Sequence, residues 1–454
     1  MRFHSLVLLM FFLAPALAAQ TEADKKILSV ADQIEGQVAK MRGHGFKHSI
    51  EKGIYNKDQL KAFILESFDE ELPPEKLAGW ETALKIFGLM PEEMNMKEML
   101  VDFYVSQIGG FYDPKTKKLF CISSGLSFMQ RIVMAHELAH ALQDQYLDLE
   151  RYYKIVEFND DLLTARSSVV EGEATHIMNL YPERYAQEMI DDLGDIKVMD
   201  VGYLFLQQFA ALMCAPPYFY DAMTFPYMDG EGFVKEAIRQ GGWQRVDDLY
   251  KAPPDSTEQI MHPEKFFQER DAPQKIVLPD LESALKGDFK KIHDNSMGEF
   301  QVKILLKHTA DAIRALRACT GWDGDTYAIY KSTEGDATFM IWALTFDSDN
   351  DAEQFREAEA KALTRKYERW GGGKADSKEK RACFESANNR CACVERRGCD
   401  VLVLDAVPTD SGIMEILWSA AWKFEKVAFE FEALKPVPYE RSGSQQQIVP
   451  ACIR

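Results

Sequence analysis

The chain has 454 residues, with 53 Lys and Arg against 72 Asp and Glu, so its formal net charge is −19. This acidic balance disfavours nucleic acid and anionic membrane surfaces as partners. A length prior of about 150 residues per domain predicts two or three domains, and the composition leaves the oligomeric state open.

The N-terminal segment has the pattern of a secretory signal peptide. Arg2 precedes an apolar run over residues 6–13, and residues 16–18 (Ala-Leu-Ala) offer small side chains for cleavage. Because the apolar run is too short to span a bilayer, we expect residues 1–18 to be removed on export.

Beyond this segment, the sequence predicts no membrane insertion. The most apolar later stretch, residues 201–215, is interrupted by Gln207 and Gln208, and a membrane helix needs about 20 predominantly apolar residues. The mature protein is therefore expected to be soluble and exported, either periplasmic or secreted.

Residues 19–105 predict a helical N-terminal subdomain. Ile27, Val30, Ile34 and Val38 recur at helical spacing, which places them on one face of a helix. We expect this subdomain to pack on the part of the chain that follows.

A β-hairpin is predicted next. Residues 107–112 and 118–122 have the composition of strands, and they flank the turn sequence Asp-Pro-Lys-Thr at residues 113–116. Proline at the second position of a turn supports this interpretation. The hairpin either edges a substrate cleft or is purely structural, and the sequence leaves both open.

An apolar helical stretch then carries the motif His136-Glu137-Leu138-Ala139-His140. Residues four apart lie about one helical turn from each other, so both imidazoles project from one face and can share a tetrahedral zinc ion. The glutamate between them lies one position round the helix, where it can accept a proton from a zinc-activated water.

A zinc site needs a third protein ligand, and the best candidates lie about 30 residues further on. Glu171 and Glu173 belong to a segment with helical periodicity, and residues two apart on a helix differ by about 200° in direction, so only one can face the metal. Their small neighbours Gly172 and Ala174 would let this helix approach the motif helix. The alternative is that both glutamates are surface charges.

Ligand histidines also need hydrogen-bond acceptors that fix their tautomer. Asp144, Asp160 and Asp161 are the candidates in the sequence. Each could equally be a solvated carboxylate.

The two histidines followed by Glu171-Gly172-x-Ala174 resemble the gluzincin metallopeptidases, whose third zinc ligand is a glutamate on a downstream helix. The resemblance assigns Glu171, rather than Glu173, as that ligand. Residues 225–230 (Phe-Pro-Tyr-Met-Asp-Gly) resemble the P-Y-x-x-G element of aminopeptidase-N-like gluzincins, in which the tyrosine stabilises the tetrahedral intermediate.

The resemblance extends over residues 100–270. The motifs HELxHALQDQ and VEGEA within it also resemble a group of exported bacterial proteins. The G-x-M-E-N element that aminopeptidases use to hold a free amino terminus is missing from the sequence, so an endopeptidase is expected. The implied site holds one zinc ion per chain through His136, His140 and Glu171, with Glu137 as general base.

Two residues are candidates to stabilise the oxyanion in addition to the metal. Tyr227 matches the tyrosine of the P-Y-x-x-G element, although it could equally be a core aromatic residue. His262 lies in a Pro-rich, irregular segment over residues 251–285, where a structural anchor is the alternative.

Residues 286–454 predict a helix followed by a small α+β domain. After a helix at 299–319, the expected order is β-β-α-β-β-α: strands 326–330 and 338–346, helix 352–370, strands 392–396 and 400–404, and helix 411–424. The fold class is therefore α+β. It combines a mainly helical, zincin-like metallopeptidase domain at 106–285, which carries the small edge β-hairpin, with a C-terminal α+β sandwich domain.

The chain has eight cysteines, and four of them lie close together: Cys383, Cys391, Cys393 and Cys399. Their spacing lacks the paired C-x-x-C knuckles of zinc ribbons, and an exported chain favours disulfides. The sequence does not determine which cysteines pair.

The function expected from these features is that of an exported zinc metallopeptidase acting on a protein or peptide substrate. The alternatives are a non-catalytic zinc-containing binding or assembly protein of the cell envelope, and a zinc hydrolase of a non-peptide substrate. Glu137 favours catalysis, because a structural zinc site needs no general base.

Overall fold

The structure is a computed structural model that describes residues 21–107, 109–122, 127–154, 159–193, 216–309, 312–378, 380–409 and 412–429. The expected signal peptide and residues 201–215 lie outside the described residues, as do Cys214 and Cys452. The fold is mixed α+β, as expected. Within the described residues, no helix is both long and apolar enough to cross a membrane.

The N-terminal part is mainly helical, as predicted. Two helices begin at capping boxes, in which Thr21 pairs with Asp24 and Asn56 pairs with Gln59. The elements are α2 (Glu22–Arg42), β1 (Glu51–Tyr55), α3 (Lys57–Glu71), α4 (Pro74–Phe87) and α5 (Met96–Gln107).

The predicted hairpin is confirmed as β2 (Gly110–Asp113) and β3 (Lys118–Ile122). Asp113 holds the turn by accepting a hydrogen bond from Lys115 N at 3.0 Å. The hairpin belongs to a three-stranded sheet of order β1-β3-β2, in which β1 runs parallel to β3. Strand β2 is therefore an edge strand, and its outer side faces the motif helix.

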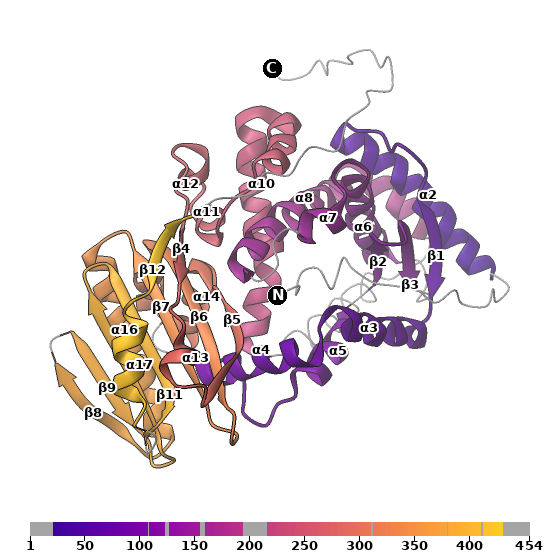
Figure 1. Ribbon diagram of the computed structural model, residues 1–454. Helices are drawn as coiled ribbons and strands as arrows, with labels where there is room; N and C mark the ends of the chain where they lie inside the picture. The colour runs from indigo at the N-terminus through magenta and orange to yellow at the C-terminus, as the bar shows by residue number, and fades with distance from the viewer. Residues whose placement is uncertain are drawn as a thin grey trace.

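Long helices form the middle of the chain: α6 (Phe128–Leu147), α7 (Leu149–Lys154), α8 (Asp160–Leu193), α10 (Pro217–Lys251), α11 (Thr257–Met261) and α12 (Glu264–Phe267). The backbone departs from helical geometry at Tyr185 in α8 and at Gly241 and Gly242 in α10. Helix α8 continues through Pro182 and helix α10 continues through Pro226, and the two helices pack along each other. Figure 1 shows these helices between the small sheet and the C-terminal sheet.

The C-terminal part is built on a seven-stranded antiparallel sheet of order β5-β6-β7-β11-β10-β9-β8. Its strands are β5 (Phe289–Asn295), β6 (Trp322–Ser332), β7 (Thr338–Phe346), β8 (Gly373–Lys378), β9 (Arg381–Glu385), β10 (Arg390–Arg397) and β11 (Asp400–Pro408). The remaining elements are β4 (Gln274–Val277), α13 (Leu281–Ala284), α14 (Gly298–Thr309), α15 (Ala312–Cys319), α16 (Asp349–Arg369), α17 (Met414–Ala421) and β12 (Glu425–Ala428).

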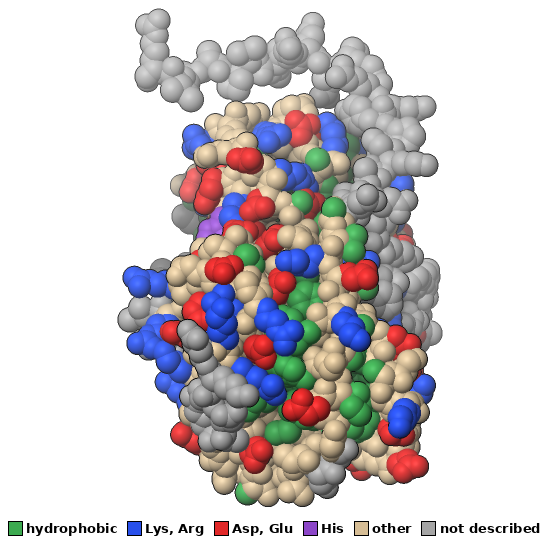
Figure 2. All heavy atoms as spheres, turned by 60° about the vertical axis from the view of Figure 1, so that its left-hand side comes forward, with side chains coloured by type: hydrophobic (Ala, Val, Ile, Leu, Met, Phe, Trp, Pro, Cys, Tyr) green, Lys and Arg blue, Asp and Glu red, His purple; other side chains and the backbone are tan. Residues whose placement is uncertain are grey.

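The predicted β-β-α-β-β-α order is present as β6, β7, α16, β10, β11 and α17. The sequence missed β5, β8 and β9, and the helix expected over 299–319 is two helices, α14 and α15. One face of the sheet packs on α16, and the other packs on α13, α17 and β4. The face of the molecule seen in Figure 2 shows a strip of hydrophobic side chains with basic and acidic side chains around it.

One disulfide joins adjacent strands of this sheet, as expected for the cysteine cluster. Cys383 on β9 lies directly opposite Cys393 on β10, and the two are bonded. Among the described residues, the free thiols are those of Cys121, Cys319, Cys391 and Cys399.

Apolar packing is continuous between the two parts of the chain. A single hydrophobic cluster includes residues from Tyr55 on β1 to Ala406 on β11. The packing therefore shows no boundary at residue 286, and the predicted division there stays a prediction.

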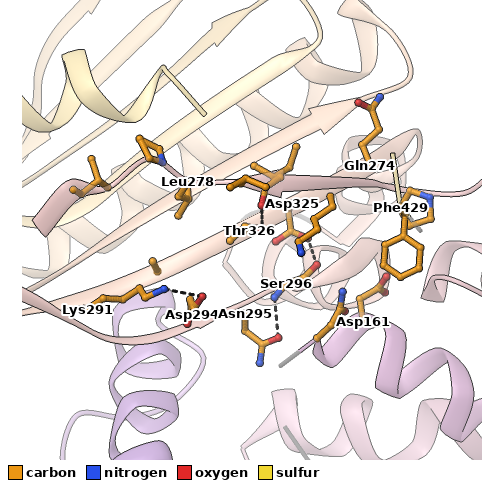
Figure 3. Close-up of a pocket in the computed structure, with 18 of the residues that line it drawn as sticks. Asp161, Gln274, Leu278, Lys291, Asp294, Asn295, Ser296, Asp325, Thr326 and Phe429 are labelled. Carbon is orange, nitrogen blue, oxygen red and sulfur yellow. Dashed lines mark hydrogen bonds and ion pairs between the residues drawn. The ribbon is translucent and has the colours of Figure 1, made fainter. Parts of the chain in front are cut away.

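A cavity of about 830 Å³ lies where the start of α8 meets β4, β5 and β6. Figure 3 shows Asp161, Ser296 and Asp325 around it. Asp325 accepts hydrogen bonds from Ser296 Oγ at 3.0 Å and from Gly298 N at 3.0 Å. Asp161 accepts one from Thr257 N at 2.9 Å. These carboxylates are thus used to join segments of the fold.

Candidate metal centre

The HExxH motif lies in the middle of α6 and points into the protein. Ser127 caps this helix by accepting a hydrogen bond from Gln130 N at 3.1 Å. The rings of His136 and His140 lie 4.5 Å apart between centroids, and their Nε2 atoms are 2.9 Å apart. The two imidazoles therefore face one point, as the spacing predicted.

Glu171 on α8 completes this group. Its Oε2 lies 3.2 Å from His136 Nε2 and 3.3 Å from His140 Nε2. Three ligands at about 2.1 Å from a tetrahedral ion would lie about 3.4 Å from one another. The exposed fractions of the three residues are 6%, 1% and 1%. This buried group can hold a metal ion.

The charges within the group also favour a cation. Burial alone would raise the pKa of Glu171, but the imidazoles of His140 and His136 outweigh it and hold that pKa well below its usual range. Burial alone would lower the pKa of His140, but the Glu171 carboxylate raises it to about 9. A positive charge between the three side chains is thus stabilised, as a proton or as a metal ion.

Gln143 fixes the tautomer of His140. Its Nε2 donates to Val170 O at 2.9 Å, which turns its Oε1 toward His140 Nδ1 at 2.8 Å. Because this oxygen can only accept, Nδ1 carries the proton and His140 Nε2 presents its lone pair to the group. The sequence missed this residue, although it lies one helical turn after His140.

The aspartates expected in this role lie elsewhere. Asp144 accepts hydrogen bonds from Tyr112 OH at 2.7 Å and from Leu149 N at 2.9 Å. Asp161 binds Thr257, as described above. Asp160 acts on a different residue: burial raises the pKa of Tyr218, and the charge of Asp160 raises that pKa further.

Glu173 is buried but turned away from the group. Its carboxylate pairs with Arg42 of α2 and accepts a hydrogen bond from Tyr250 OH. The alternative that both glutamates are surface charges is therefore wrong, since each is 1% exposed.

These contacts form a continuous polar network from the His136 group to the C-terminal end of α2. Gln143 Nε2 donates to Tyr250 OH at 3.1 Å, and Arg42 pairs with Asp247, which lies 3.1 Å from His44 Nε2. The members of the network are His140, Gln143, Tyr250, Glu173, Arg42, Asp247 and His44. The orientation of His140 is thus tied to the N-terminal helix.

A close approach of α8 and α10 places Glu171 beside Tyr227. A Cβ atom on Gly172 would lie 2.2 Å from the carbonyl carbon of Gly230, and one on Gly230 would lie 2.2 Å from Ser168 O. The absence of a side chain at Gly172 therefore allows α8 to pack closely on α10. The sequence predicted a close approach to α6 instead. Ala174 does pack in the cluster that contains residues of α6.

Tyr227 lies against the metal group. Its ring stacks on His136 with centroids 5.7 Å apart and an interplanar angle of 21°. Burial raises its pKa well above the usual value, and the charges of Glu171 and Glu137 raise it further. The phenol therefore keeps its proton and can donate a hydrogen bond.

Glu137 is held by the edge strand of the small sheet. Tyr112 N on β2 donates to Glu137 Oε2 at 2.9 Å. Burial raises the pKa of Glu137, while His136, His140 and the Tyr112 N–H oppose this shift. The hairpin thus contributes directly to the site by orienting the candidate base.

His262 lies in a different cluster. Its Nε2 is 3.0 Å from Glu299 Oε1 on α14, and Glu299 raises its pKa. Within the described residues, no hydrogen bond or ion pair joins His262 to the His136 group, which favours its alternative as an anchor.

A second group of acidic side chains, Glu258, Asp271 and Asp347, has metal-like spacing. Lys265 Nζ lies among them, at 2.6 Å from Glu258 Oε1, 2.8 Å from Asp271 Oδ2 and 3.0 Å from Asp347 Oδ2. A lysine already supplies the cation there, so the His136 group remains the metal candidate.

Comparison with known families finds one match. A family model described as a domain of unknown function (DUF8575) matches residues 288–417. This segment contains the whole seven-stranded sheet, covers less than half of the chain and excludes the His136 group. No curated protein and no solved structure matches the chain.

Proposed function

We propose that the protein is a zinc-dependent metallopeptidase. The observation that carries this proposal is the convergence of His136 Nε2, His140 Nε2 and Glu171 Oε2 within 3.3 Å in a buried site, with Glu137 on the same helix. Two imidazoles and one carboxylate are the ligand set of catalytic zinc in thermolysin-type enzymes.

The residues present fit such an ion. Gln143 leaves the lone pair of His140 Nε2 free, and the three ligand atoms are close enough to share one centre. When bound there, zinc acts as a Lewis acid and lowers the pKa of water toward neutrality.

Glu137 has the role of general base in this proposal. Its Oε2 is occupied by the Tyr112 N–H, so its other oxygen can take the proton of the attacking water and deliver it to the leaving amine nitrogen. A pKa raised by burial suits a group that must both accept and return a proton. Tyr227 donates a hydrogen bond to the oxyanion that develops on the scissile carbonyl.

Metal content and cleavage of unfolded casein test the proposal on the full exported chain. The wild type should hold about one zinc ion per chain. Glu137→Gln should keep zinc and lose about 100-fold or more in cleavage rate. Glu171→Gln should lose zinc, whereas Glu173→Gln should retain more of it, because only Glu171 reaches the histidines.

Glu98→Gln, an exposed glutamate on α5, is the control and should behave as wild type. Wild-type cleavage by Glu137→Gln would overturn the assignment of the base. A zinc-loaded wild type that cleaves neither casein nor a mixed peptide library would overturn the peptidase proposal and favour a non-catalytic zinc protein.

A further inference from the structure

A second cavity, of about 580 Å³, lies where the part of the chain that matches the domain of unknown function meets the segment after α4 and the start of α10. It lies between α16, the segment after α4, the start of α10 and the end of α14. Glu359 and Lys366 line it from one stripe of α16, because residues seven apart return to the same side of a helix, and Trp370 directly after the helix also lines it.

Glu359 is an unsatisfied acid in the wall of this cavity. It is 4% exposed, and its Oε2 has no hydrogen-bond partner among the described residues. An unpaired buried polar atom costs about 1–3 kcal/mol, so such a group needs an explanation. The carboxylates Asp161 and Asp325 at the other cavity (Figure 3), by contrast, already accept hydrogen bonds from the protein.

Lys366 is the cation that acts on Glu359 in the protein, but its ammonium group binds other partners. Lys366 Nζ pairs with Asp405 and also donates to Ile86 O. Asp405 accepts a further hydrogen bond from Tyr367 OH at 2.9 Å. It is followed by Ala406, a non-glycine residue with a left-handed backbone (φ 58°), at a bulge in the pairing of β11 with β10. Bulges re-aim side chains and are common beside functional sites.

The rim of the cavity carries two arginines, together with the exposed Glu92 in the segment after α4. Arg365 and Arg369 lie one turn apart on α16 and are exposed, while Glu359 lies deep. Between the two ends the lining includes Ala362 and Leu363. At about 1.5 Å per residue, the rim arginines lie roughly 9–15 Å along the helix axis from Glu359.

We propose that this cavity binds an ω-amino carboxylate, a lysine-like molecule or a chain end of that type. Its ammonium group pairs with Glu359, its methylene stem lies on Ala362 and Leu363, and its carboxylate pairs with Arg365 and Arg369. The side chain of a carboxyl-terminal lysine has this chemistry, and so does 6-aminohexanoate.

Binding of the ammonium group has a consequence for protons. Burial and the charge of Asp405 raise the pKa of Glu359 to about 8, against the opposing effect of Lys366. Lys85 and His308 also line the cavity, but Lys85 pairs with Glu81 and His308 with Asp221. Glu359 must ionise to pair with the ligand, so affinity should rise about tenfold from pH 7 to pH 9, with proton release at pH 7.

Isothermal titration of the full chain with 6-aminohexanoate tests the proposal. Hexanoate and pentylamine, which each lack one charged end, should bind about tenfold more weakly or worse. Glu359→Gln should lose about tenfold or more in affinity together with the proton release, and Arg369→Gln should lose affinity but keep the proton release. Glu357→Gln, an exposed glutamate on the same helix, is the control.

Equal binding of hexanoate and 6-aminohexanoate, or the absence of binding at millimolar ligand, would overturn the proposal. If Glu359→Gln does not fold, the comparison of ligands on the wild type and on Arg369→Gln still decides the outcome. None of these measurements depends on zinc or on peptide cleavage.

Discussion

The contact between α8 and α10 offers the sharpest test of how the site is built. In Gly172→Ala, the new Cβ would lie 2.2 Å from the carbonyl carbon and 2.3 Å from the oxygen of Gly230. Ordinary carbon contacts begin at about 3.5 Å, so the helices must separate by roughly an ångström. No side-chain rotation relieves the clash, because the opposing atoms are backbone.

The expected cost follows from these distances. Overpacking of a core costs about 1–3 kcal/mol, and a backbone wall places this case at the upper end. Alanine favours the helix by about 1 kcal/mol relative to glycine, which offsets part of this cost. We therefore expect a net loss of about 2 kcal/mol in the free energy of unfolding. Since α8 is already packed on α6, α10 should move and carry Tyr227 away from His136. Catalytic rate should therefore fall more than zinc affinity.

Denaturant unfolding, zinc titration and peptide cleavage would measure these effects. Gly232→Ala is the matched control, because a Cβ at this position of α10 meets nothing within 4 Å. This variant should gain about 0.5–1 kcal/mol. Equal unfolding midpoints for the two variants would refute the reasoning that the helices need glycine to meet.

Three further outcomes are expected. Tyr250→Phe removes the hydroxyl between Gln143 and Glu173 and should weaken zinc binding about tenfold in competition with a chromophoric chelator; Tyr152→Phe, whose hydroxyl has no partner among the described residues, should not. Chelation should lower the thermal midpoint of the wild type but not that of His140→Ala, because only the former has a metal to lose. Burial raises the pKa of Asp161 to about 7, so the folded state holds its proton more tightly than the unfolded state, and stability should fall as pH rises from about 4 to 7; denaturant titrations should show a smaller fall in Asp161→Asn, and an unchanged one would contradict this assignment.

The sequence predicted those elements whose structure is specified by residues close together in the chain. The β2–β3 hairpin and the HExxH helix lie where turn chemistry and helical spacing placed them, and strand β7 has the predicted bounds, residues 338–346. Glu171 was assigned by resemblance and lies beside the two histidines. These features are specified by residues close together in the chain or by a motif.

Elements that depend on distant partners were missed. Strand β1 has no alternating pattern, and it forms because β3, whose Lys118 pairs with Glu51, offers an edge. Strands β8 and β9 are short and rich in charged residues, and they extend a sheet whose core lies at β7 and β11. Tyr250 is about 110 residues from His140, so no spacing rule could connect it with the site.

The polar network gives α2 a role that its apolar spacing did not indicate. Arg42 is buried, and its charge is balanced by Glu173 and Asp247. Removing one partner of a buried ion pair costs about 3–5 kcal/mol, because the other charge is left uncompensated. Without Arg42, Glu173 would carry a buried charge that no cation balances, and the carboxylate that accepts the Tyr250 hydroxyl would no longer be held in place by an ion pair. The hydrogen bonds behind His140 therefore extend to a helix that lies about 100 residues earlier in the chain, and α2 helps to support the candidate metal centre.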